Sequence, residues 1–399
     1  MDNMDFAEAV EEICTISAKP VIVLIDEVDQ AGNNDGFIKF LGGLRTMYLE
    51  RAGHPTFQSV ILAGVYDVKN LKLKIRTDDE HQYNSPWNIA VPFDVDMSLP
   101  AKGITDMLDE YAGEHGIQFD TGGVGQMIRD YTSGYPFLVS RLCQIIDEKA
   151  YTWNKEGVLR AVNDILMERN TLFDNMIKKL DEYPELKRML KTILLSGMDS
   201  TYNPDEKYIQ IAYMFNYIEN RGGKIAVACR IMETRLYNLF IKEEEQSDFY
   251  RQGQMDKSEF VRDGVIDMRH LLERFVVHMN ETYKMDVENK FIENDARKIF
   301  LTYLRPVING TGNYYCEAQT RDLTRTDVVV DYHGRQYVIE LKIWRGEAYN
   351  ERGERQLAEY LDYYHLQTGY MVSFCFGRSK QPGVHEVKVG DRTLIEAIV

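Results

Sequence analysis

Residues 327–344, DVVVDYHGRQYVIELKIW, decide the fold of the C-terminal third of the chain. Two apolar runs flank the turn-forming tripeptide His-Gly-Arg, so the stretch predicts two adjacent strands, over 327–332 and 336–344. Glu340 and Lys342 are two residues apart on the second strand and therefore share one face of it. The tight turn lets Asp327 reach the same face from the first strand. Two carboxylates and one ammonium group are therefore expected to converge.

Two carboxylates beside a lysine form a set of groups suited to phosphodiester hydrolysis. Carboxylate oxygens are hard ligands that bind Mg²⁺ or Mn²⁺. Such an ion lowers the pKa of a bound water, and a lysine can orient that water or neutralise the charge that develops on the phosphate. The alternative is a salt-bridge ladder on an exposed strand face. Against it, the strand is apolar on both faces, so a buried Glu340 and Lys342 need close partners or a catalytic role.

The elements around this hairpin predict a compact α/β domain from residue 271 to the end. Apolar periodicity and turn signals indicate a helix, three strands, a second helix, a fourth strand and a final hairpin. The first six of these elements are expected, in chain order, at 292–304, 314–319, 327–332, 336–344, 353–365 and 370–376.

The spacing of Asp327, Glu340 and Lys342 resembles the PD-(D/E)XK nuclease motif in its D…ExK form. The resemblance covers most of residues 290–380. Gln356, in the sequence QLAEYL, resembles the QxxxY signature that follows the ExK strand in many members. Thr326 stands where the motif has a proline, a departure that is common in this superfamily.

This resemblance implies a restriction-endonuclease-like domain with a magnesium-dependent hydrolase activity, and it assigns roles to five residues. Asp327 and Glu340 would be the metal ligands, and Lys342 would position the attacking water and stabilise charge. Gln356 and Glu293, the acidic residue of the first helix, would support them. Three further residues flank the site and are candidates for phosphate contacts: Arg321, Arg325 and Arg345.

The N-terminal region predicts a βαβ unit. The apolar run 21–25 has the pattern of a strand buried on both faces, 36–51 has helical periodicity, and 59–65 is a second apolar strand. Asp26 and Glu27 follow the first strand. Together they resemble the Walker B strand of an AAA-like or STAND-type ATPase, whose acidic residues hold Mg²⁺ and polarise the attacking water.

The same resemblance extends to about residue 245 and implies further nucleotide-site residues. Asp67 would follow the sensor strand, and the tripeptide at 134–136, Gly-Tyr-Pro, is similar to the lid motif that packs against adenine. ATP is therefore a possible ligand through Asp26, Glu27 and Asp67.

The phosphate-binding loop of such an ATPase is missing from the sequence. No GxxxxGK[ST] motif occurs, and only 20 residues precede the Walker B strand. The sequence therefore does not predict ATP hydrolysis by this chain alone. Two explanations stay open: a truncated or late-initiated form of a longer protein, or a domain that has lost nucleotide binding and serves as a scaffold. Either leaves apolar strand faces that a protein partner or an oligomer would cover, and a partner chain could also complete the ATPase.

The middle of the chain is expected to be helical, with a short strand at 224–228 before a helix at 230–239 in a winged-helix-like arrangement. The charged stretch 242–263 breaks the apolar periodicity and predicts a linker or mobile loop. The whole chain is then α/β and multidomain. Its expected parts are a partial AAA-like core at 1–100, a helical lid and winged-helix-like region at 101–270, and the nuclease-like domain at 271–399.

Composition limits the partners and the compartment. The 399 residues carry a formal net charge of −16, which excludes non-specific attraction of nucleic acid by the whole molecule, but only −2 of it lies beyond residue 284. Five scattered cysteines indicate no disulfide framework or zinc site. The N-terminus lacks the pattern of a signal peptide, and no stretch reaches the ~20 apolar residues that span a bilayer. The sequence therefore predicts a cytoplasmic protein without a membrane partner.

The combined expectation is a bacterial metal-dependent nuclease, acting on DNA, coupled to a degenerate or truncated AAA-like ATP-binding module. The alternative is a nucleotide-sensing or DNA-binding regulatory protein whose winged-helix-like middle does the work and whose nuclease fold is inert.

Overall fold

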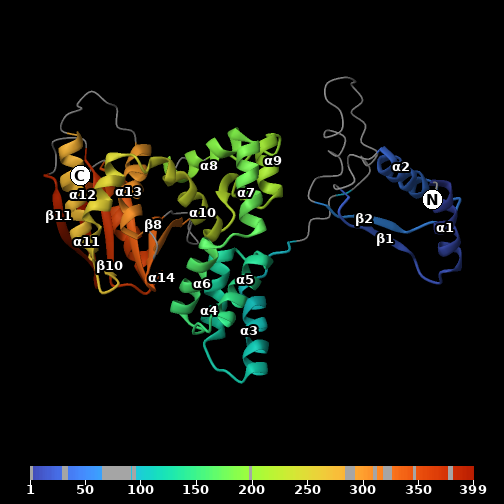
Figure 1. Cartoon of the computed structure of the whole chain (residues 1–399), viewed down its shortest axis with the longest axis horizontal. Coiled ribbons are helices and arrows are strands. Elements are labelled where there is room, and N and C mark those ends of the chain that lie inside the picture. Colours follow the sequence, from blue (N-terminus) through green and yellow to red (C-terminus); the bar gives the residue numbers. More distant parts are fainter. Residues whose placement is uncertain are drawn as a thin grey trace. The chain divides into compact units, whose positions relative to one another are not determined.

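The structure is a computed structural model that falls into two compact units, Met1–Asp96 and Met97–Val399. Figure 1 shows the elements of both units. The second unit contains both segments that the sequence divides at residue 270. The residues that the structure describes are 3–28, 35–64, 91, 96–196, 200–283, 293–308, 312–317, 326–344, 347–375 and 381–399.

The first unit contains the predicted βαβ arrangement. Its elements are α1 (Asn3–Ile16), β1 (Ile22–Ile25), α2 (Asp35–Leu49) and β2 (Ser59–Leu62), and the two strands pair in parallel. The expectation that the first strand is buried on both faces is wrong for the described residues, because Ile22 and Leu24 are 53% and 73% exposed. Only the alternate positions pack against the small core formed with α1 and α2, around Leu41 and Phe57.

The second unit begins with a helical part that carries a two-stranded hairpin, β3–β4, and the predicted helix after it. Several of its helices begin at a residue whose side chain accepts a backbone N–H, such as Asp120, Asn154 and Asn170. The elements are α3 (Ala101–His115), α4 (Thr121–Thr132), α5 (Pro136–Glu148), α6 (Lys155–Met167), α7 (Thr171–Glu182), α8 (Pro184–Ser196), α9 (Lys207–Met214), β3 (Ile218–Arg221), β4 (Lys224–Val227), α10 (Arg230–Ile241) and the 3₁₀ turn η2 (Lys242–Glu244).

The C-terminal part is built on a six-stranded sheet with the strand order β11-β12-β10-β9-β8-β7. The predicted order of helix, three strands, helix, strand and final hairpin is confirmed. Two helices and a small hairpin precede it: α11 (Asp248–Phe260), β5 (Val261–Arg262), β6 (Val265–Ile266) and α12 (Met268–Tyr283). The domain itself consists of α13 (Glu293–Ile308), β7 (Gly312–Glu317), β8 (Thr326–Tyr332), β9 (Arg335–Ile343), α14 (Glu347–Tyr363), β10 (Thr368–Phe374), β11 (Gly383–Val389) and β12 (Arg392–Ile398).

Helix α13 continues past Pro306, where the sequence predicts that it has ended. A proline inside a helix removes one backbone hydrogen bond. Here Val307 and Ile308 are fully buried beyond it, and their burial offsets that loss.

Helices cover both faces of the sheet. On the face opposite Glu340, Phe275 of α12 meets Phe374 of β10 with ring centroids 6.4 Å apart, and the hydroxyl of Tyr337 accepts the backbone N–H of Ile266. On the face of Glu340, α14 packs closely against the sheet. A Cβ added to Gly369 of β10 would lie only 3.0 Å from the side chain of Leu361 of α14. The central strand β9 is thus buried from both sides.

A buried polar cluster joins the helical part to the sheet. Tyr131 of α4 donates a hydrogen bond to Asp331 of β8, and Gln336 of β9 donates to the other carboxylate oxygen at 3.0 Å. The guanidinium of Arg230, at the start of α10, lies 5.0 Å from the centre of the Tyr315 ring. Burial raises the pKa of Asp331 from 3.8 to about 6, although these neighbours favour its ionised form.

We expect Asp331→Asn to make stability less dependent on pH. With a raised pKa in the folded state, the carboxyl contributes stability that is fully present below pH 3.8 and is lost as pH rises through about 6. The difference in free energy of unfolding between wild type and variant should change by about 2 kcal/mol from pH 4 to pH 7, to the disadvantage of the wild type. Urea denaturation at several pH values measures it, and parallel curves would contradict the assignment.

The charged stretch 242–263 is not a linker. Most of it forms helix α11, which packs so tightly on α13 that a Cβ on Gly253 would lie 2.1 Å from the carbonyl oxygen of Tyr303. Its polar face carries a buried carboxylate, Asp256, which is 4% exposed. The sequence misleads here because the acidic side chain that breaks the apolar pattern is itself buried among partners.

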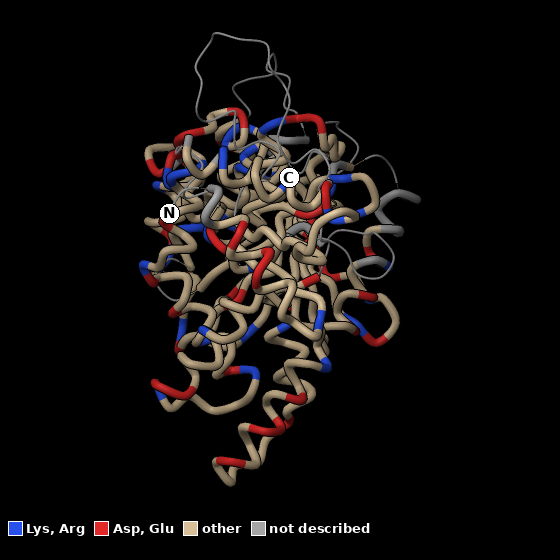
Figure 2. The backbone as a smooth tube through the Cα atoms, turned by 90° about the vertical axis from the view of Figure 1, so that its right-hand side faces the viewer, with Lys and Arg blue, Asp and Glu red and all other residues tan. Residues whose placement is uncertain are grey.

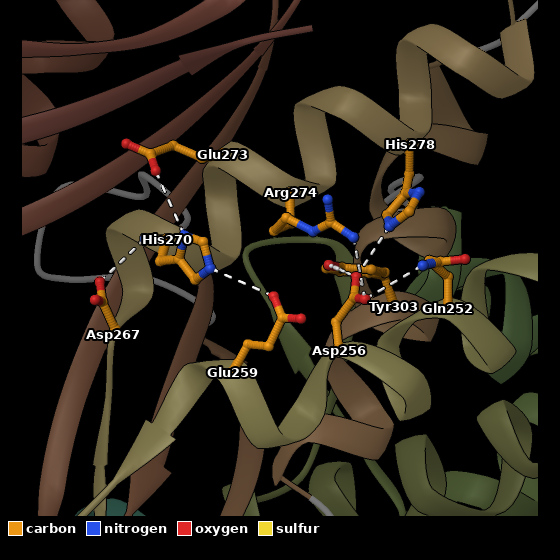
Figure 3. A network of polar contacts seen from close by, with 9 residues as sticks. All are labelled: Gln252, Asp256, Glu259, Asp267, His270, Glu273, Arg274, His278 and Tyr303. Atoms are coloured by element: carbon orange, nitrogen blue, oxygen red, sulfur yellow. Dashed lines mark hydrogen bonds and ion pairs between the residues drawn. The ribbon is translucent and has the colours of Figure 1, made fainter.

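Figure 3 shows these partners around Asp256. One carboxylate oxygen is 2.9 Å from Nε2 of His278 and accepts the Tyr303 hydroxyl at 3.1 Å. The other accepts Gln252 at 3.2 Å and Arg274 at 3.4 Å. Burial alone would raise the pKa of Asp256, but the hydrogen bonds from His278 and Tyr303 and the charge of Arg274 hold it below its usual range.

Asp256→Ala should lower the free energy of unfolding by about 3 kcal/mol, because it leaves several buried donors and a partly buried arginine without their acceptor. Glu259→Ala is the matched control. This carboxylate lies on the same helix but is largely exposed, and its contact with His270, at 3.6 Å, is longer than a hydrogen bond. We expect its effect to stay within about 0.5 kcal/mol. Equal losses in the two variants, measured by chemical denaturation, would show that the network is not the source of stability.

Candidate active site

Glu340 and Lys342 form an ion pair on the central strand β9. Nζ of Lys342 lies 2.8 Å from Oε1 of Glu340, and the two side chains are 16% and 1% exposed. The predicted shared face is therefore confirmed. An exposed salt-bridge ladder does not fit, because the glutamate is buried. A buried carboxylate needs a close cationic partner, and the lysine supplies it.

Asp327 occupies the second position of β8, the strand beside β9. The antiparallel register pairs Val328 with Ile339, so its continuation by one residue places position 327 opposite Glu340. Residues at opposite positions of neighbouring strands lie on the same face. The side chain of Asp327 is outside the described residues, so its contacts with Glu340 stay a prediction.

Helix α14 lies against Lys342 at Gly353. A Cβ at this glycine would be 2.9 Å from Cε of Lys342, so only glycine leaves the lysine its present position. Gln356 follows Gly353 by about one helical turn on α14. Glu293 is the first residue of α13.

The roles proposed for the supporting residues stay predictions. The side chains of Gln356 and Glu293 lie outside the described residues, as do Arg321, Arg325 and Arg345 as a whole.

A second buried carboxylate on this face was missed by the sequence reasoning. Glu396 of β12 is 3% exposed and accepts a 2.7 Å hydrogen bond from the hydroxyl of Ser373, which is fully buried on β10. Ser373 is the register partner of Lys342. The sequence feature that indicates this buried carboxylate is a glutamate inside the apolar run TLIEAIV, residues 393–399.

The chemistry of these side chains suits a hard divalent cation. Glu340 offers carboxylate oxygens in a buried position, and position 327 supplies a second carboxylate from the neighbouring strand. Among the side chains that the structure describes, no group of three or more histidine, cysteine, aspartate or glutamate residues is placed to hold a metal ion. The side chain of Asp327 is not among them.

The residues expected at a nucleotide site are only partly described. Asp26 and Glu27 follow the carboxyl end of β1, and both are exposed. A carboxylate oxygen of Asp26 accepts the backbone N–H of Glu27 at 2.8 Å, and Glu27 has a left-handed backbone with φ of 54°. Asp67 lies outside the described residues. In the expected lid motif, Gly134 approaches the backbone of Leu99 so closely that a Cβ would lie 2.2 Å from its carbonyl oxygen.

Comparison with known proteins adds little to this site. No protein-family model matches the chain, and no curated protein matches it. One solved structure that is similar is the Walker-type ATPase paby2304 of Pyrococcus abyssi, with 13% sequence identity and a TM-score of 0.40. The match covers 57% of this chain and 66% of that ATPase, slightly less than two thirds of its length. A similarity of this size supports no inference about activity.

In the described part of the chain, none of the helices has the length and apolar character to cross a membrane.

Gly353→Ala should move Lys342 away from Glu340 and lower the free energy of unfolding. The new Cβ would lie 2.9 Å from Cε of Lys342, so the lysine must shift and the buried Glu340 loses its close cation. We expect a loss of about 2 kcal/mol, although alanine favours a helix by about 1 kcal/mol over glycine. In the control Gly113→Ala on α3, the new Cβ meets nothing within 4 Å, and stability should stay unchanged or rise. A melting temperature of Gly353→Ala at or above that of wild type would contradict this account.

Proposed function

We propose that this protein is a metal-dependent nuclease that hydrolyses phosphodiester bonds in DNA. The observation that carries the proposal is the buried Glu340–Lys342 ion pair on the central strand, with Asp327 at the opposing register position. A carboxylate and an ammonium group are costly to bury, so their placement beside a second carboxylate position favours a catalytic role over a structural one. The D…ExK spacing supports the same reading.

Each residue has a defined role in this proposal. Asp327 and Glu340 would hold Mg²⁺ or Mn²⁺, which when bound supplies a water of lowered pKa and stabilises negative charge on the phosphate. Lys342 would orient the attacking water through its ammonium protons and neutralise charge that develops on the phosphate oxygens. Gln356 and Glu293 would support this arrangement from α14 and α13.

DNA contact would have to be local. The chain carries a net charge of −16, and in the view of Figure 2 the basic and acidic positions of the described residues are interspersed. Long-range attraction to the phosphate backbone is therefore weak, and binding would rest on groups near the site.

The nucleotide-binding module is the second part of the proposal. In this proposal a partner chain or an oligomer supplies the phosphate-binding loop, Asp26, Glu27 and Asp67 contact ATP and its Mg²⁺, and ATP regulates the nuclease. Equilibrium dialysis with labelled ATP tests this part separately from cleavage.

Cleavage of linear, supercoiled and single-stranded DNA with Mg²⁺ or Mn²⁺ tests the nuclease. Asp327→Ala and Lys342→Ala should each reduce the rate by about 100-fold or more, because the first removes a ligand of the metal ion and the second removes a positive charge that stabilises the transition state. Lys388→Ala is the control, as this lysine is exposed on β11 and paired with Glu386; its rate should not change. If wild type binds DNA but cuts none of these substrates, the regulatory alternative is favoured.

A further inference from the structure

Helices α4 and α6 meet strands β7 and β8 at a surface that we call the joint, and hydrogen bonds between polar side chains cross it. Tyr131 of α4 donates to the carboxylate of Asp331 on β8. The amide of Asn313 on β7 donates to the side-chain oxygen of Asn163 on α6 at 3.0 Å. A polar interface inside a chain holds its two sides less firmly than a large apolar one does. Few changes at the joint are therefore needed to shift its stability.

Asp331 differs from other buried carboxylates of the chain in its partners. It is 8% exposed, and its two hydrogen-bond donors, Tyr131 and Gln336, are both neutral. The buried carboxylates of Asp256 and Glu340 each have a lysine or arginine nitrogen within 3.4 Å. A buried charge is costly without a close cation. Ionisation of Asp331 therefore costs more than neutral hydrogen bonds return.

The other ionisable groups around Asp331 come from α4, α6, α10 and β7. Tyr131 and Tyr315 stay protonated, because burial raises the pKa of both. Lys155 and Arg230 attract the ionised carboxylate, but the guanidinium of Arg230 lies over the two tyrosine rings, 5.5 and 5.0 Å from their centres. This attraction does not outweigh burial, since the pKa of Asp331 is still raised to about 6.

We propose that Asp331 is a protonation switch for the joint. The neutral carboxyl holds α4 and α6 on the sheet, and ionisation favours states in which the joint opens and water reaches the carboxylate. The proposal does not depend on the proposed nuclease.

The direction of the pH effect follows from linkage between protonation and opening. The pKa of Asp331 is about 6 in the closed joint and returns toward 3.8 when water reaches the group. The closed joint is therefore favoured at low pH and loses this advantage as pH rises through about 6. The open fraction should rise roughly tenfold between pH 5 and pH 7.5.

Hydroxyl-radical footprinting with mass spectrometry of the full chain measures the opening at side chains. Tyr131 and Tyr315 lie on opposite sides of the joint and are 2% and 0% exposed, so they are oxidised only when it opens. Their oxidation rates should rise roughly tenfold from pH 5 to pH 7.5. Tyr217 and Tyr360, each 1% exposed and outside the joint, are internal controls whose rates should not change.

Three variants separate the switch from a merely structural role. Asp331→Asn keeps the shape but cannot ionise, so the rise should disappear. Tyr131→Phe removes a donor that favours the ionised form, so the rise at Tyr315 should exceed that of the wild type. Glu156→Gln is the matched control, because this glutamate lies beside Gly334, in the turn after β8, but is 54% exposed; the rise should stay as in the wild type.

The result that supports the proposal is a rise at Tyr131 and Tyr315 that Asp331→Asn abolishes. No rise in the wild type, or an equal rise in Asp331→Asn, overturns it. A rise of the same size at Tyr217 and Tyr360 also overturns it, because pH then acts on unfolding of the whole unit. If Asp331→Asn does not fold, Tyr131→Phe carries the test, and a rise at Tyr315 no larger than in the wild type overturns the proposal.

Discussion

The burial of Glu340 is the constraint on which the C-terminal part depends. A carboxylate that is 1% exposed on the central strand of a six-stranded sheet must be matched by a cation, and Lys342, two residues away, is the match at 2.8 Å. The strand can hold both only because its neighbours β8 and β10 pair with it on either side and α14 covers the face. Gly353 is part of the same arrangement, since any larger residue would meet the lysine.

The helical part and the sheet share a second polar centre on the same face, around Asp331. Position 327 and Asp331 lie on one strand, four residues apart, so the strand that presents the candidate metal ligand is also tied to α4 through Tyr131. The helical part and the strand that presents position 327 are therefore joined by a buried hydrogen bond.

Helix α11 shows where a charge pattern misleads. Its acidic and basic residues interrupt the apolar periodicity, so the sequence suggests an exposed linker. Asp256 is instead buried, with donors from α11, α12 and α13 around it. The pattern of one helix cannot show this, because the groups that compensate the buried charge come from two other helices. The exposed Ile22 and Leu24 are the reverse case, since an apolar run predicts burial but does not supply the surface that covers it.

The sequence by itself determined the order of the C-terminal elements and the shared face of Glu340 and Lys342, because both follow from local periodicity and a turn. It also determined the βαβ unit near the N-terminus. Only the tertiary structure decided that Ser373 is the register partner of Lys342 and donates to the buried Glu396, and that Asp256 and Asp331 are buried. These relations join residues far apart in the chain through strand register and helix packing, and neither register nor packing is encoded in the spacing of residues within one element.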